Sequence, residues 1–149
     1  MRYRKFMPAC LLGLAFAAPW SHAAAPDPSL VGCWRAVRIV LQLQDGSKME
    51  DTSGRCVLQF KEEQFESACG TASGTATTTY QYRIVRPGFY SATMTGSTFR
   101  TDLVGSAREY EYHVEGERLV TVNKPQVPVP APATATTRVE TEATKIACP

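Results

Sequence analysis

The sequence lacks the features that define several large classes of protein. No charge-free apolar run reaches the roughly 18 residues of a membrane-spanning helix, and no segment has the apolar period of an amphipathic helix. With 16 Lys and Arg against 14 Asp and Glu in 149 residues, the chain also lacks the basic excess of a nucleic-acid-binding protein. A hydrophobic content of 44%, with ten prolines and ten glycines, excludes coiled-coil, collagen-like and fully disordered chains. These absences leave a small, turn-rich globular protein.

Residues for catalysis or metal binding are equally scarce. Histidine occurs only at His22 and His113, and no C-x-x-C pair is present. The small-residue stretch 70–74 does not match the G-x-S-x-G nucleophile elbow. Glu109 and Glu111 share one side of an expected strand, which is more typical of a solvated outer stripe than of paired catalytic carboxylates. We therefore expect no enzyme activity, no metal and no cofactor.

The first 23 residues predict a secretory signal peptide. Arg2, Arg4 and Lys5 precede an apolar stretch over 6–18, and small residues ending at Ala23 suit cleavage there. An anchoring N-terminal helix is the alternative. Cleavage would leave 13 basic and 14 acidic side chains in a single domain over 24–149. The expected location is the periplasm, or outside the cell, with no transmembrane segment in the mature chain.

The four cysteines that remain after cleavage predict two disulfides. Placing Phe60 opposite Phe65 in a hairpin also sets Cys56 opposite Cys69, on the same face. Three pairings are possible in principle. The hairpin favours Cys56–Cys69, which leaves Cys33 near the mature start to pair with Cys148 near the end.

The mature sequence reads as an all-β domain of roughly nine strands. Strands are expected over 30–43, 56–60, 65–69, 75–85, 89–95, 99–104, 108–114, 118–122 and 136–146, with a loop or edge strand over 48–55. Apolar residues on both sides of the strand over 30–43 suggest that both of its faces are covered by other parts of the protein for part of its length. The proline-rich segment 124–134 is expected to be an extended crossing before the last strand, with a disordered C-terminus as the alternative.

The hairpin over 108–122 allows two registers. A three-residue loop pairs Tyr112 with Val120 and Tyr110 with Val122, apolar against apolar, and is the preferred register. A two-residue loop sets Val120 against Glu111 or His113.

The order of motifs resembles the lipocalin/calycin group and small bacterial lipocalin-like domains. Its opening Gly32-x-Trp34 lies on a long first strand, and it is followed by Leu58-x-Phe60, Tyr80-x-Tyr82, Pro87-Gly88-Phe89-Tyr90 and Glu117-Arg118-Leu119. The resemblance implies an antiparallel up-and-down barrel of 8–9 strands, braced here by disulfides. It also implies that Trp34 closes one end beneath a cationic side chain from the last strand, for which Arg138 is the candidate.

The function expected from this resemblance is binding of a small apolar or amphipathic ligand inside the barrel. The candidate ligand contacts are the aromatic residues expected to face inward: Trp34, Phe60, Phe65, Tyr80, Tyr82, Phe89, Tyr110 and Tyr112. The alternative is a periplasmic protein-interaction module, such as a hydrolase inhibitor, an immunity protein or an envelope-assembly accessory, that presents the turns at 61–64 and 86–88. No nucleic-acid partner is expected.

Overall fold

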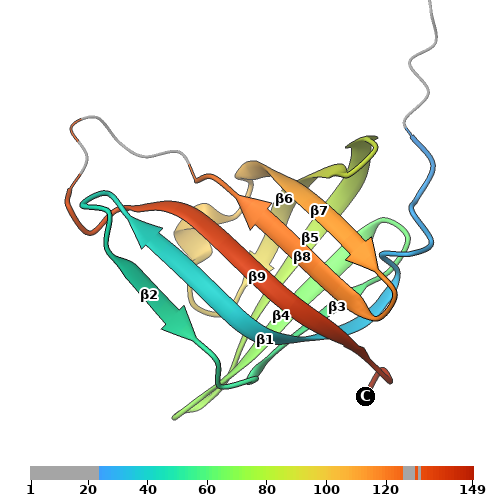
Figure 1. The fold of residues 1–149 in the computed structure, drawn as a ribbon, viewed down its shortest axis with the longest axis horizontal. Coiled ribbons are helices and arrows are strands. Elements are labelled where there is room, and N and C mark those ends of the chain that lie inside the picture. Colours follow the sequence, from blue (N-terminus) through green and yellow to red (C-terminus); the bar gives the residue numbers. More distant parts are fainter. Residues whose placement is uncertain (1–23, 126–129, 131) are drawn as a thin grey trace, which may run out of the picture.

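An antiparallel sheet closes on itself through pairing of its first and last strands (Figure 1). The computed structural model describes residues 24–125, 130 and 132–149. The predicted signal peptide and part of the proline-rich crossing therefore lie outside the described residues. The strands are β1 Gly32–Leu43, β2 Lys48–Asp51, β3 Cys56–Phe60, β4 Gln64–Thr71, β5 Gly74–Arg86, β6 Phe89–Ser97, β7 Ala107–Glu115, β8 Arg118–Asn123 and β9 Thr136–Ile146.

The strand order confirms the predicted all-β, up-and-down barrel. From β3 to β9 each strand pairs with the next, and β1 pairs with β9 along nearly its whole length. The first half of β1 also pairs with β3, whereas its second half pairs with β2. Eight strands thus form the barrel, and β2 is an extra edge strand outside it. Within the part of the chain described, no helix has the length and apolar character needed to cross a membrane.

Both predicted disulfides are present. Cys56 lies opposite Cys69 in the β3–β4 hairpin, and Phe60 lies opposite Phe65, so the predicted register is confirmed. Cys33 bonds to Cys148 across a separation of 115 residues. This second bond ties the beginning of β1 to the residues that follow β9, where the two strands already pair.

A β-bulge explains the apolar residues on both sides of β1. Trp34 and Ala36 face the barrel interior and are buried. The pairing with β9 then shifts between Ala36 and Arg38, which leaves Val37 as the extra residue. The shift reverses the alternation, so Ile39 and Leu41 face inward beyond it. The apolar residues change from one face of β1 to the other because of the bulge. Cys33 lies on the outer face and is buried because it is bonded to Cys148.

Two expectations about the second half of the chain are wrong. The β7–β8 hairpin has the two-residue loop, and His113 pairs with Val120 while Tyr112 pairs with Thr121. This register directs Leu119, which is fully buried, into the core. Residues 99–104 do not form a strand. They hold a short 3-10 helix, η1, over Thr101–Leu103, at the point where β6 ends.

Trp34 closes one end of the barrel, as expected from the Gly32-x-Trp34 motif. Its side chain is fully buried, and its indole N–H donates to the carbonyl of Leu30 at 2.9 Å. The cation over the ring is Lys145, with Nζ 5.1 Å from the ring centroid, and not Arg138, which pairs with Glu140. Gly32 has a φ of +132°, and a Cβ there would lie 3.2 Å from Lys145 Cε. Glycine is therefore required beside this lysine.

We predict that the two disulfides stabilise the fold unequally. By the chain-entropy relation, the 115-residue separation of Cys33 and Cys148 corresponds to about 5 kcal/mol, and the 13-residue separation of Cys56 and Cys69 to about 3 kcal/mol. C33A/C148A should therefore lower the free energy of unfolding more than C56A/C69A in urea titrations. An equal loss of unfolding free energy in the two double variants, or a larger loss in C56A/C69A, would contradict the prediction that Cys33–Cys148 is the more stabilising disulfide.

Candidate functional site: a cavity at one end of the barrel

The two ends of the barrel differ in how they are filled. At the end where β1 begins, which we call the closed end, the preceding segment lies against the interior. Leu30 is fully buried there, and Asp27 accepts a hydrogen bond of 2.7 Å from the Tyr112 hydroxyl. Asp27 also accepts from the backbone and side chain of Ser29. These contacts hold the segment before β1 against the barrel.

The opposite end, which we call the open end, contains a cavity of about 380 Å³. Its wall comes from inward-facing positions of the barrel, and η1 with its flanking residues lies at its rim. The lining residues are Leu41, Thr78, Tyr80, Met94, Phe99, Arg100, Leu103, Arg108, Pro125, Thr136 and Val139. Pockets for small ligands commonly measure about 300–1,000 Å³, so this cavity is at the small end of that range.

Strand alternation directs the lining residues inward. On β5, Thr78 and Tyr80 lie on the same side as the buried Tyr82 and Ile84. On β6, Met94 follows the buried Tyr90 and Ala92 at the same two-residue spacing. β1 contributes Leu41, which the bulge has turned inward and which pairs with Val139 of β9.

Stacked aromatic rings form the floor of the cavity and separate it from the closed end. Tyr80 stacks on Phe65 with ring centroids 4.3 Å apart, and Tyr90 stacks on Tyr110 at 4.8 Å. Phe60 stacks on Phe65 beneath them. Aromatic stacking contributes beyond simple burial, so this layer is a firm boundary. The cavity lies where Thr78, Met94, Leu41 and Val139 stand at inward positions in place of rings.

The cavity has one polar side, built around an arginine. Arg108 pairs with Ala92 across β6–β7 and precedes Tyr110 and Tyr112 on the same face of β7. Its positive charge is half-buried beside tyrosine side chains. At the rim, Arg100 is already paired with Asp102 through two contacts of 3.0 Å. Within the described ranges, no group of three or more His, Cys, Asp or Glu side chains is arranged to hold a metal ion.

Burial raises the pKa values of the tyrosine hydroxyls in the interior. It raises the pKa of Tyr110 to about 12 even though the charge of Arg108 and a hydrogen bond with Asn123 act in the opposite direction. Burial likewise raises the pKa of Tyr80, again opposed by Arg108, and raises the pKa of Tyr82 to about 12. Tyr90 is fully buried and its pKa lies well above the usual value. These hydroxyls are neutral donors and acceptors at physiological pH.

The eight aromatic residues proposed from the sequence divide into three groups. Tyr80 lines the cavity, and Tyr110 lies in the floor beside it. Trp34, Phe60, Phe65, Tyr82 and Tyr112 are buried in the packed core toward the closed end. Phe89 does not face inward: it pairs with Glu111 on the outer face, beneath the Arg86 guanidinium at 3.8 Å. The neighbouring Tyr90 occupies the inward position.

The sequence reasoning missed most of the cavity wall because it considered only aromatic residues. Thr78 and Met94 share the alternation of Tyr80 and Tyr90, so the pattern contained their positions. Arg108 likewise shares the alternation of Tyr110 and Tyr112. Leu103 had no comparable signal, because η1 follows no strand period.

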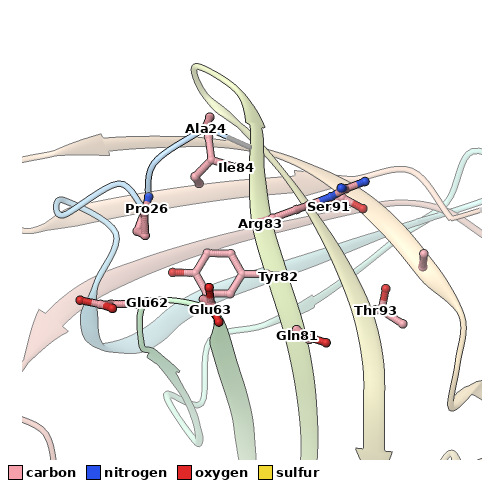
Figure 2. Close-up of a pocket in the computed structure, with 11 residues that line it drawn as sticks. Ala24, Pro26, Glu62, Glu63, Gln81, Tyr82, Arg83, Ile84, Ser91 and Thr93 are labelled. Atoms are coloured by element: carbon pink, nitrogen blue, oxygen red, sulfur yellow. The ribbon is translucent and has the colours of Figure 1, made fainter. Parts of the chain in front are cut away.

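A second hollow of about 480 Å³ lies on the outside of the barrel, against β5 and β6 (Figure 2). It is bordered by side chains of these strands, by the β3–β4 turn, by residues that precede β1 and by Ala107: Gln81, Tyr82, Arg83, Ile84, Ser91, Thr93, Glu62, Glu63, Ala24, Pro26 and Ala107. Although this groove is larger, its charged side chains are exposed to solvent. The cavity at the open end combines inward apolar side chains with a few polar groups, as ligand sites typically do.

Comparisons with known proteins identify the fold. No protein-family model and no curated protein matches the sequence. Among solved structures, a lipocalin-like protein from Bacteroides uniformis matches with a TM-score of 0.52 at 12% identity, over 79% of this chain and 99% of that one. An uncharacterized protein from Bacteroides eggerthii matches with a TM-score of 0.50 at 12% identity, over 78% of this chain and 98% of that one. The fold is therefore lipocalin-like.

We predict that the interior tyrosines resist ionisation until the barrel opens. Unfolded tyrosine titrates near pH 10, whereas Tyr82 and Tyr110 have pKa values of about 12 in the folded chain. Their contribution to stability is thus complete below pH 10 and is lost as the pH rises through about 12. Absorbance at 295 nm should show the interior phenolates appearing together with loss of the circular dichroism signal. Ionisation of these tyrosines near pH 10 in a folded protein would show an accessible interior.

Proposed function

We propose that this protein is an exported binding protein that holds a small apolar or amphipathic ligand in the cavity at the open end. The supporting observation is the uneven filling of the barrel. An eight-stranded barrel is just wide enough to be filled by side chains or to hold one small ligand. Here aromatic rings fill one part, and a cavity of about 380 Å³ remains in the other.

The chemistry of the wall indicates the kind of ligand. Leu41, Met94 and Val139 provide apolar contact, and Met94 adapts its shape readily. Arg108 and Tyr80 provide polar groups at the same cavity. A molecule with an apolar body and a polar group fits this combination best.

Export is supported by the covalent framework and by the predicted signal peptide. Disulfides persist in oxidising compartments such as the periplasm and are rare in the cytosol. The two bonds found here use all the cysteines of residues 24–149. The proposed location is the periplasm, with secretion as the alternative.

A protein-interaction module is the second candidate function. The observation in its favour is the exposure of Phe99, of which 61% is accessible, and of Val104 on the segment that contains η1. Both residues flank the rim of the cavity, so they are also placed to contact a ligand that enters there. The turns at 61–64 and 86–88 lie at the closed end and present mainly charged side chains.

Native mass spectrometry of protein purified from its own compartment tests the two candidates directly. We expect a bound small molecule that is released when the protein is denatured. Co-purification of one stoichiometric protein, with no small molecule, would favour the interaction module instead. Export is tested separately by N-terminal sequencing of the isolated protein, for which we expect Ala24 as the first residue.

We predict that filling the cavity abolishes binding of an apolar fluorescent probe. Val139→Trp places an indole at the cavity wall, whereas the control Val122→Trp places one on the outer face of β8, where Val122 pairs with Glu111. The fluorescence of N-phenylnaphthylamine should increase when the probe binds the wild-type protein or Val122→Trp. The affinity of Val139→Trp for the probe should be at least about tenfold lower. Equal binding to all three proteins would place the probe outside the cavity.

A further inference from the structure

Arg108 is a cation that faces into the barrel without an acidic partner. On β7 its neighbours Ala107 and Glu109 are exposed, whereas Arg108 alternates with them and lines the cavity. The acidic residues of this strand point the other way: Glu109 bonds to Arg86 on the outer face. Among the residues that the structure describes, no carboxylate forms an ion pair with Arg108.

The other inward residues around the open end offer no negative charge either. They are neutral side chains: Leu41, Thr78, Tyr80, Met94, Tyr110, Asn123 and Val139. Asp102 lies near the rim, but its carboxylate already accepts two hydrogen bonds from the Arg100 guanidinium. The half-buried guanidinium of Arg108 acts on Tyr80 and Tyr110, whose hydroxyls are neutral. The interior therefore has a positive charge that an incoming anion would neutralise.

A buried polar atom on the neighbouring strand β8 has no hydrogen-bond partner. Asn123 is only 4% exposed, and its side-chain oxygen has no hydrogen-bond partner. It pairs across the sheet with Tyr110 on β7 and with Val139 on β9, so it adjoins the cavity wall. Buried polar atoms normally have partners. This oxygen only accepts hydrogen bonds, so it would pair with a donor of the ligand and not with an anion. The charge preference of the site therefore rests on Arg108 alone.

The geometry points to a ligand with an anionic head group, a carboxylate or a phosphate monoester, bound by Arg108, and with an apolar tail against Leu41, Met94 and Val139. This inference rests on the proposed function and adds the charge of the ligand. The planar guanidinium fork of arginine matches both head groups. If each methylene group of an alkyl tail occupies about the volume of a water molecule, roughly 30 Å³, the cavity of about 380 Å³ accommodates a tail of about a dozen carbons. Decanoate has this size and chemistry.

The test compares three probes that share one tail: decanoate, decyl phosphate and decan-1-ol. Isothermal titration of the delipidated protein should give an affinity for decanoate or decyl phosphate at least about tenfold above that for decan-1-ol. The ranking of the two anions distinguishes a carboxylate ligand from a phosphate ligand.

Variants then assign the preference to one residue. Arg108→Gln should weaken binding of the preferred anion about 10- to 100-fold, as expected for loss of a charge-assisted hydrogen bond. Its affinity for decan-1-ol should stay within about twofold of the wild-type value. Arg83→Gln is the matched control, because Arg83 is exposed on the outer face of β5. Arg108→Lys retains the positive charge without the planar guanidinium fork. Its affinity for the anion should lie between those of the wild type and Arg108→Gln.

The possible results separate this inference from the proposed function. Binding of all three probes with equal affinity would overturn the anionic head group and leave the binding function intact. Loss of anion binding in Arg83→Gln as large as in Arg108→Gln would overturn the role of Arg108. Failure of every probe, including N-phenylnaphthylamine, would overturn the binding function itself. If Arg108→Gln does not fold, the wild-type preference for the anion over decan-1-ol decides the question.

Discussion

The pairing of β1 with β9 is the constraint on which the rest of this structure depends. It joins the first and last strands of the sheet, converts a meander into a ring and thereby creates an interior. Nearly the whole chain lies between the paired strands, so closure carries a large entropic cost. The Cys33–Cys148 bond reduces that cost by keeping the two strands together in the unfolded chain. Without closure, the inward face would be one side of an open sheet, and it would not surround a cavity.

Once the ring is closed, the sizes of the inward side chains decide where it is solid and where it is hollow. Trp34 and the stacked rings of Phe60, Phe65 and Tyr90 fill the part near the closed end. Beyond Arg35, β1 separates from β3 and continues beside β2. This separation occurs on the side of the cavity, where inward positions also hold smaller residues. Strand pairing and residue size therefore favour space at the same end.

Much of the fold was predictable because it follows from two-residue alternation and from the cysteines. The β3–β4 register required only that Phe60 face Phe65. The β7–β8 register failed because pairing apolar with apolar counted Val120 and Val122 as core, whereas Leu119 and the small polar Thr121 and Asn123 occupy the interior. The bulge at Val37 and the 3-10 turn after β6 depend on closure geometry, which local sequence does not encode.

The candidate site was harder to predict because it is defined by space that side chains leave unfilled. Aromatic residues are conspicuous in the sequence, and most of them form the core that limits the cavity. The residue that distinguishes the cavity chemically is Arg108, which alternation places among tyrosines. An arginine on the inward face of an otherwise neutral wall departs from the pattern that builds the core. Such departures are expected where a site is under functional constraint, and this one lies at the wall of the cavity at the open end.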